Sequence, residues 1–163
     1  MGFSNKRGQT VFDTIMVIIV LFILALAAII GSIVFSGVND DVQADTTLSN
    51  QTKTTMSTIN DNYTNWFDAA ILGALIFFWA LLLITSFLID THPVFFIVTV
   101  LLLMAVFVVS MIISNAYVEI TTDSDMSAFS VQFPLTNFIM NNLLIIIIVI
   151  GLSTGVALYA KFQ

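Results

Sequence analysis

The chain of 163 residues has no cysteine, two prolines and one histidine, and only 9% of its residues are charged. Without cysteine, it can form neither disulfides nor zinc–thiolate sites, and it has no thiol nucleophile. Soluble domains usually contain about 25% charged residues, so this scarcity argues against an ordinary water-soluble globule. Four Lys and Arg stand against ten Asp and Glu, which gives a formal net charge of −6. The sequence therefore offers no cationic surface for binding nucleic acid.

Apolar residues make up 59% of the chain, and they gather in long uncharged stretches. About 20 apolar residues in a helix cross a hydrocarbon core of roughly 30 Å. In lipid, the backbone of such a stretch satisfies its own hydrogen bonds by forming a helix. Four stretches are long enough to span, namely 15–35, 69–89, 94–113 and 138–160. The sequence predicts an all-α integral membrane protein, with four transmembrane helices in two hairpins forming one membrane domain over residues 1–163.

The few basic residues predict the orientation of these spans. Lys6 and Arg7 precede the first span, and Lys161 follows the fourth. An even number of crossings places both termini on one side, together with three of the four cations. The positive-inside rule then predicts that both termini are cytoplasmic. The outer segments 37–67 and 114–137 fall on the opposite side.

The first outer segment, 37–67, contains a helical pattern within a polar sequence. Its apolar residues recur at spacings of three and four, which is typical of one helix face. These residues are Met56, Ile59, Tyr63, Trp66 and Ala70. We expect the first hairpin to extend beyond the bilayer and to turn near residues 45–50, with Ser49 or Asn50 capping the returning helix. The stripe either packs on the neighbouring helix or docks a partner through Met56, Ile59, Tyr63 and Trp66.

The second outer segment, 114–137, predicts a short helix at the membrane interface. Ser124 and Asp125 suit a helix start, and Pro134 ends it. Its apolar face comprises Met126, Phe129 and Phe133, of which the two phenylalanines are candidates for contacting a partner. Thr136 or Asn137 is positioned to cap the fourth span.

Small residues at a spacing of four mark candidate faces for packing between transmembrane helices. Gly151 and Gly155 form a Gly-x-x-x-Gly pair in the fourth span. Ala27 with Gly31, and Ala69 with Gly73, match the looser pattern in the first and second spans. Trp79 lies in the middle of the second span, where its indole N–H needs a hydrogen-bond partner. These residues predict a compact bundle or an oligomer.

Ionisable side chains are confined to the ends of the predicted spans. Asp13, Asp68 and Asp90 lie at such ends, where we expect water to reach them. His92 falls in the tight link between the second and third spans, which we interpret as a hairpin turn. Pumps and transporters depend on ionisable groups inside their spans. We therefore expect no catalytic, cofactor or metal site, and we expect the protein not to be an enzyme.

Three stretches and the Lys6-Arg7-Gly8-Gln9 start carry a resemblance to a known group of proteins. The stretches are Ile89-Asp90-Thr91-His92-Pro93-Val94-Phe95-Phe96, Ser114-Asn115-Ala116-Tyr117-Val118-Glu119 and Phe133-Pro134-Leu135-Thr136-Asn137-Phe138-Ile139-Met140. They resemble small polytopic membrane proteins of tailless, membrane-containing viruses with double jelly-roll capsids. The resemblance implies a structural protein of the virion's internal membrane, which links that membrane to the capsid or to other membrane proteins.

Our leading hypothesis is a non-enzymatic structural membrane protein that shapes or stabilises a lipid layer within a larger assembly. Its partners would be the lipid bilayer, capsid or other membrane proteins, and further copies of itself. Two alternatives remain open. A pore-forming protein of the holin type would permeabilise cells when expressed alone. An accessory subunit of a cellular membrane complex would co-purify with that complex instead of with a capsid protein.

Overall fold

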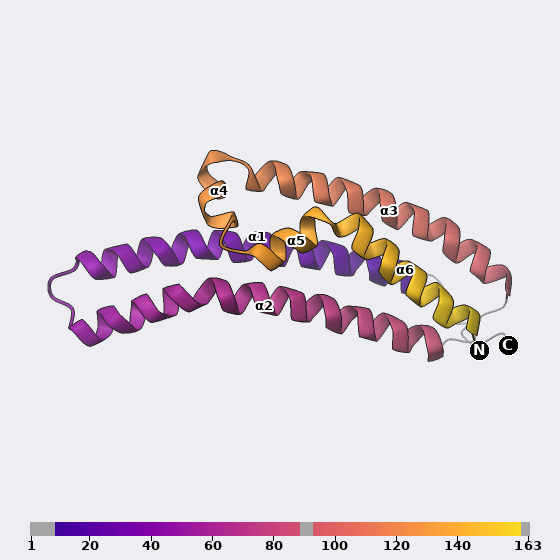
Figure 1. Cartoon of the computed structure of the whole chain (residues 1–163), viewed down its shortest axis with the longest axis horizontal. Helices are drawn as coiled ribbons and strands as arrows, with labels where there is room; N and C mark the ends of the chain where they lie inside the picture. Colours follow the sequence, from indigo (N-terminus) through magenta and orange to yellow (C-terminus); the bar gives the residue numbers. More distant parts are fainter. Residues whose placement is uncertain (1–8, 89–92, 161–163) are drawn as a thin grey trace, which may run out of the picture.

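The computed structural model describes residues 9–88 and 93–160, and all six elements in these ranges are helices (Figure 1). The helices are α1 (Gln9–Ala44), α2 (Asn50–Leu88), α3 (Pro93–Thr121), α4 (Ser124–Ser130), α5 (Pro134–Asn141) and α6 (Leu143–Ala160). The predicted all-helical architecture is confirmed for the described residues.

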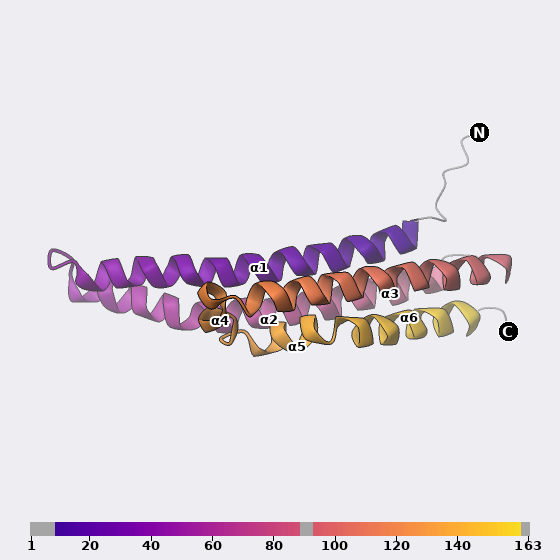
Figure 2. The same ribbon diagram turned by 90° about the horizontal axis from the view of Figure 1, so that it is seen from above.

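Four long helices pack around a common core. Contacts run from α1 to α2, from α2 to α6, from α6 to α3 and from α3 back to α1, so the helices close a ring. Both hairpins lie side by side in the two views (Figure 1, Figure 2). The α1–α2 hairpin is longer than the other pair, and its turn extends well beyond α4 (Figure 1). We call residues 37–67, which include this extension, the arm.

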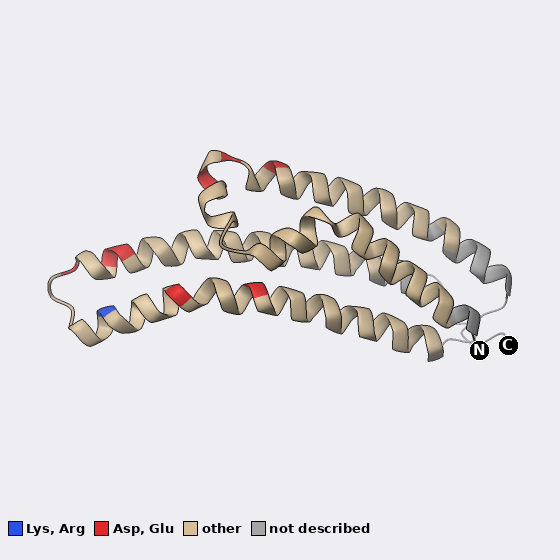
Figure 3. Cartoon of the chain, viewed as in Figure 1, with Lys and Arg blue, Asp and Glu red and all other residues tan. Residues whose placement is uncertain are grey.

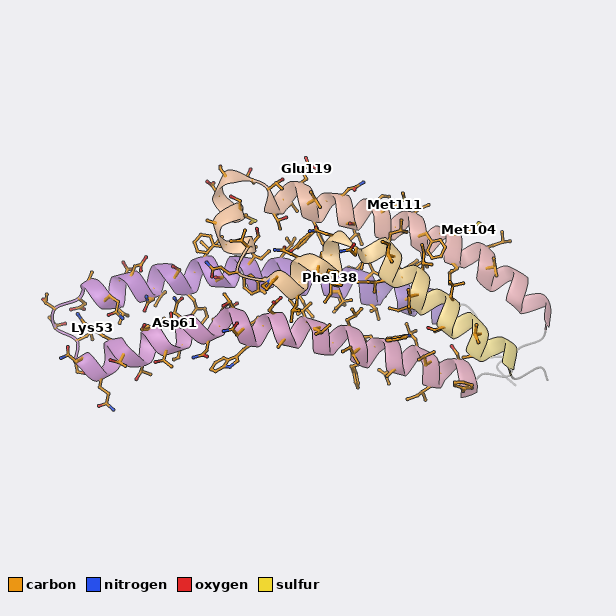
Figure 4. The ribbon with its side chains drawn as sticks, viewed as in Figure 1. Lys53, Asp61, Met104, Met111, Glu119 and Phe138 are labelled. Carbon is orange, nitrogen blue, oxygen red and sulfur yellow. The ribbon has the colours of Figure 1, made fainter. Side chains whose placement is uncertain are left out.

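Among the described residues, three single helices are long and apolar enough to cross a membrane, and they lie within α1, α2 and α3. Their outer faces remain apolar, and Figure 4 shows Met104 and Met111 along the exposed side of α3. A fourth crossing exists only if α5 and α6 count as one span, because they meet at a bend of 71°. This number of apolar helices is consistent with an integral membrane protein.

The expected span over 138–160 is not one continuous helix, because α5 ends at Asn141 and α6 begins at Leu143. The intervening Asn142 adopts φ −108° and ψ 18°, and its side-chain amide donates to the Phe138 carbonyl at 2.8 Å. Asparagine side chains compete with helical backbone bonding in this way. The bend therefore has a local cause in Asn142, which lies within the stretch 138–160 that was expected to form one continuous span.

The turn between α1 and α2 lies at residues 45–49, as expected. Ser49 caps α2, because its hydroxyl accepts from the Thr52 backbone N–H at 3.2 Å. Asp45 accepts from both the backbone N–H and the hydroxyl of Thr47, each at 2.7 Å. These short-range hydrogen bonds stabilise the turn.

The arm is joined to the bundle by an aromatic stack. Tyr63 is buried and stacks between Phe35 and Phe67, with ring centroids 4.8 and 4.4 Å away. Gly31 permits this packing, since a Cβ there would overlap the end of the Tyr63 ring, lying 2.9 Å from Cζ. The tyrosine is thus held from both helices at the base of the arm.

The expected stripe on α2 is only partly correct. Tyr63 packs on the neighbouring helix, but Trp66 and Ala70 are exposed, with 62% of the Trp66 surface accessible. The buried face of α2 instead continues from Tyr63 through Asp68 to Ile71. The buried face of α2 therefore includes a charged residue, Asp68, which a search for apolar residues at helical spacing does not find.

Candidate functional site

Asp68 is the most deeply buried charged residue of the described chain, with 4% of its surface exposed. It lies on α2 and faces the start of α5. Its Oδ1 accepts from the backbone N–H and the hydroxyl of Thr136, each at 2.6 Å, and its Oδ2 accepts from the Leu135 N–H at 2.9 Å. The expectation that water reaches Asp68 at a span end is therefore wrong, because three protein donors surround the carboxylate.

The start of α5 explains why a carboxylate is needed at this point. The first N–H groups of a helix have no partner within the helix. Phe133 occupies the N-cap position and makes no side-chain cap, and Pro134 has no N–H to donate. Asp68 therefore caps α5 from another helix, and its negative charge suits the positive end of the helix dipole. The expected capping role of Thr136 is replaced by this contact.

Further hydrogen bonds connect this cap to α3 and α4. The Tyr117 hydroxyl donates to Asn137 Oδ1 at 2.7 Å, and Asn137 Nδ2 donates to the Ser130 carbonyl at 2.7 Å. The Ser130 hydroxyl in turn donates to the Thr121 carbonyl at 3.3 Å. We call Asp68, Tyr117, Ser130, Thr136 and Asn137 the Asp68 cluster. It ties four helices together at the level where the arm leaves the bundle.

The Asp68 cluster has the geometry of a structural joint. Both carboxylate oxygens already accept hydrogen bonds from protein donors. Among the side chains that the structure describes, every buried nitrogen or oxygen has a hydrogen-bond partner. The described part of the chain also holds no group of three residues suited to binding a metal ion. The hydrogen bonds of the Asp68 cluster therefore hold α2, α3, α4 and α5 against one another.

A second polar contact holds α2 against α6. The Trp79 indole N–H donates to the Ser153 hydroxyl at 3.0 Å, and Ser153 itself donates to the Ile150 carbonyl at 2.8 Å. The partner that the half-buried indole needs is therefore on a helix of the same chain. This hydrogen bond lies well inside the apolar half of the bundle, away from the Asp68 cluster.

The candidate packing residues divide into two groups. Gly31 and Gly151 make close contacts, since a Cβ on Gly151 would lie 2.8 Å from Leu103 Cδ1. Gly73 and Gly155 face open space, with nothing within 4 Å of an added Cβ. Ala27 is exposed. Each pair of small residues thus contributes at most one member to packing within the chain.

The candidate docking residues are also divided by the fold. Tyr63 and Phe133 are buried within the chain and cannot contact a partner. Phe129 is half-buried on α4. Trp66 is exposed at the base of the arm, whereas Met56 and Ile59 lie nearer its tip.

Met56 and Ile59 help to form a groove on the arm. Its volume is about 400 Å³, and Val42 from α1 and residues from α2 line it. Two reciprocal hydrogen bonds brace the arm beside it: Gln43 Nε2 donates to the Lys53 carbonyl at 2.9 Å, and Lys53 Nζ donates to the Gln43 carbonyl at 2.8 Å. The groove is therefore carried by a hairpin whose two helices are fastened to each other.

Charge is distributed unevenly along the molecule. Every acidic side chain that the structure describes lies on the arm or near the Asp68 cluster and α4, and the described side chains of the opposite half carry no charge (Figure 3). Figure 4 places Lys53 and Asp61 on the arm and Glu119 at the far end of α3. Asp90 and His92 lie outside the described residues, as does the side chain of Asp13.

Sequence reasoning missed the pairing of Asp68 with Thr136. The available signals were an acid at the start of a predicted span and a Pro134-x-Thr136 helix start. No local pattern connects two segments that are 68 residues apart. Comparison with known proteins adds no further assignment: no protein-family model, curated protein or solved structure matches this chain.

Proposed function

We propose that the chain is a non-enzymatic structural protein of a membrane-containing assembly, which anchors in the lipid layer and presents a rigid arm to other components. The observation that carries this proposal is the projection of the α1–α2 hairpin beyond the remaining helices (Figure 1). The aromatic stack around Tyr63 and the Asp68 cluster hold the base of that hairpin. A braced projection on an apolar base suits a scaffold or a linker.

Helix lengths support this division into anchor and arm. α6 has 18 residues, which at about 1.5 Å per residue is roughly 27 Å, close to the thickness of a hydrocarbon core. Along α2, the distance from Asn50 to Asp68 is also roughly 27 Å by the same rise. With the membrane boundary at the Asp68 cluster, the arm would reach that far from the lipid.

The proposed orientation places the arm on the non-cytoplasmic side and both termini on the cytoplasmic side. The beginning of α1 and the end of α6 lie at the same end of the bundle, opposite the arm (Figure 1). The acidic residues on the arm would then be in water, whereas the uncharged half would be in lipid (Figure 3). The basic residues near the termini agree with this orientation.

We further propose that the assembly is a virion with an internal membrane. The support is the resemblance of three stretches to small membrane proteins of double jelly-roll viruses. In such a particle, the arm would bridge the lipid layer and the capsid or another membrane protein. Multiple copies would pack through small residues such as the exposed Ala27 and Gly155, which has open space beside it.

Mass spectrometry of gradient-purified particles tests the proposal. We expect this protein in intact particles and in the lipid-containing core after the capsid shell is removed. Absence from the particles would overturn the viral assignment, and co-purification with a cellular membrane complex would indicate an accessory subunit. Loss of membrane potential on expression of the chain alone would instead indicate a pore-former of the holin type.

A further inference from the structure

The groove on the arm contains apolar surface that the chain itself leaves uncovered. Val42 and Met56 are half-buried there, and Ile59 remains exposed. Ile59 lies nine residues before Asp68 on α2, which corresponds to roughly 14 Å along the helix. With the lipid boundary at the Asp68 cluster, as in the proposed function, lipid tails do not reach this groove. An apolar contact for Val42, Met56 and Ile59 would therefore come from another protein segment.

The negative charge of the arm indicates which kind of protein segment would bind in the groove. The arm carries four aspartates and a single cation, Lys53, whose ammonium group is bonded to the Gln43 carbonyl. Asp41 and Asp45 are exposed and lie within three residues of Val42 along the chain, at the same end of the arm as the groove. A second copy of this arm would bring like charges together, which disfavours self-association. A basic partner would be attracted.

The form of the groove favours a helical segment as the occupant. It lies between two antiparallel helices, and its lining combines the apolar Val42, Met56 and Ile59 with the polar Gln51, Thr52 and Thr55. An amphipathic helix places its apolar face into such a groove and leaves its polar face in water. Methionine adapts its shape to the side chains of a partner.

We propose that this groove binds a basic amphipathic helix of a partner protein in the assembly. The inference rests on the proposed function, and it assigns the chemistry of the partner that the arm docks. Apolar side chains of the partner contact Val42, Met56 and Ile59, while its Lys or Arg side chains approach Asp41 and Asp45.

The test uses the full chain in phosphatidylcholine nanodiscs and a labelled synthetic helix of leucine and lysine as the probe. Binding is measured by fluorescence anisotropy, with empty nanodiscs as the blank. We expect Ile59→Ser to weaken binding about tenfold, because a central apolar contact is lost. The double variant Asp41→Asn with Asp45→Asn should weaken binding several-fold and reduce its dependence on salt.

Matched controls separate docking from ionic adsorption. Val118→Ser changes an exposed apolar residue on α3 outside the groove, and it should leave the affinity unchanged. A scrambled peptide of the same composition should bind weakly, because it has no continuous apolar face. A peptide with glutamate in place of lysine should not bind.

Equal binding of the scrambled peptide, or an unchanged affinity for Ile59→Ser, would overturn the inference. Absence of binding by the leucine–lysine helix would overturn it as well. Each variant is compared with the parent by its melting temperature, and Met56→Ser provides a second groove variant if Ile59→Ser unfolds. If the protein is present in purified particles but does not bind the peptide, the proposed structural role is supported and only this inference is overturned.

Discussion

Polar side chains are satisfied by protein partners in the apolar bundle and by water in the arm. In the bundle, polar side chains bond to the protein: Ser110 donates to the Val106 carbonyl, and Trp79 donates to Ser153. In the arm, Asp40, Asp41 and Asp61 are exposed on the helix surfaces. A carboxylate is tolerated in the arm because water solvates it, and it is tolerated at Asp68 because three donors replace that water.

An aspartate therefore contributes differently to folding stability in the two regions. An exposed acid on a helix contributes little to folding, whereas an acid that satisfies buried donors is difficult to remove. The boundary between the two regimes lies at the Asp68 cluster, where the arm joins the bundle. Mutations on either side of that boundary should therefore differ sharply in effect.

The largest expected effect is that of Asp68→Ala. The substitution leaves two backbone N–H groups and the Thr136 hydroxyl buried without an acceptor, so we expect the free energy of unfolding to fall by about 3 kcal/mol or more. Asp61→Ala, on the exposed surface of the same helix, should change it by less than about 0.5 kcal/mol. Thermal unfolding in detergent micelles measures both. Equal melting temperatures for the two variants would contradict the distinction drawn here.

Gly31→Ala should have the next largest effect. The added Cβ would overlap Tyr63, which is held by its stack with Phe35 and Phe67, so we expect a loss of about 1–3 kcal/mol in unfolding free energy. Gly73→Ala, in open space on α2, should instead be neutral or stabilise by up to about 1 kcal/mol through helix propensity. Chemical denaturation of the two variants provides the comparison, and destabilisation by Gly73→Ala would indicate an intermolecular contact at that face.

A smaller effect is expected for the polar contact inside the bundle. Trp79→Phe removes the indole donor, and Ser153→Ala removes its acceptor, so a double-mutant cycle isolates their hydrogen bond. We expect a coupling free energy of about 1 kcal/mol, the usual value for a neutral hydrogen bond. A coupling of zero would mean that the indole packs against α6 without contributing through its N–H.

The smallest effect is expected at the turn of the arm. Hydrogen bonds from the hydroxyl and backbone N–H of Thr47 lower the pKa of Asp45 below its ordinary value, and Lys53 adds a weaker effect. Because the pKa is lower in the folded state, this contribution to stability is present above the unfolded pKa and is lost as pH falls through the folded one. Thr47→Val should raise the pKa of Asp45 toward its ordinary value. NMR titration of the carboxyl carbon measures it, and an unchanged pKa would show that the backbone N–H alone is responsible.

Sequence reasoning succeeded where the cause was local. The turn at 45–49 and its Ser49 cap follow from residues a few positions apart, and α4 begins at Ser124 as expected. The expectation that Pro134 ends this helix was wrong, because α4 already ends at Ser130 and Pro134 begins α5. Sequence reasoning also failed at Asn142, where a short-range side-chain bond interrupts a run of apolar residues. The long apolar run over 138–160 predicted one straight helix. It gave no sign of the bend at Asn142.

The sequence by itself determined the helical class, the lengths of the apolar segments and the division between uncharged spans and an acidic arm. These properties depend on composition and on hydrogen bonds within a few residues. Only the tertiary structure decided that Asp68 is a buried cap for α5, that Gly31 and not Gly73 is close-packed, and that Trp79 bonds to Ser153. The physical reason is that the burial of these residues and their hydrogen bonds depend on side chains of other helices. Those side chains lie tens of residues away along the chain, so no local pattern reveals them.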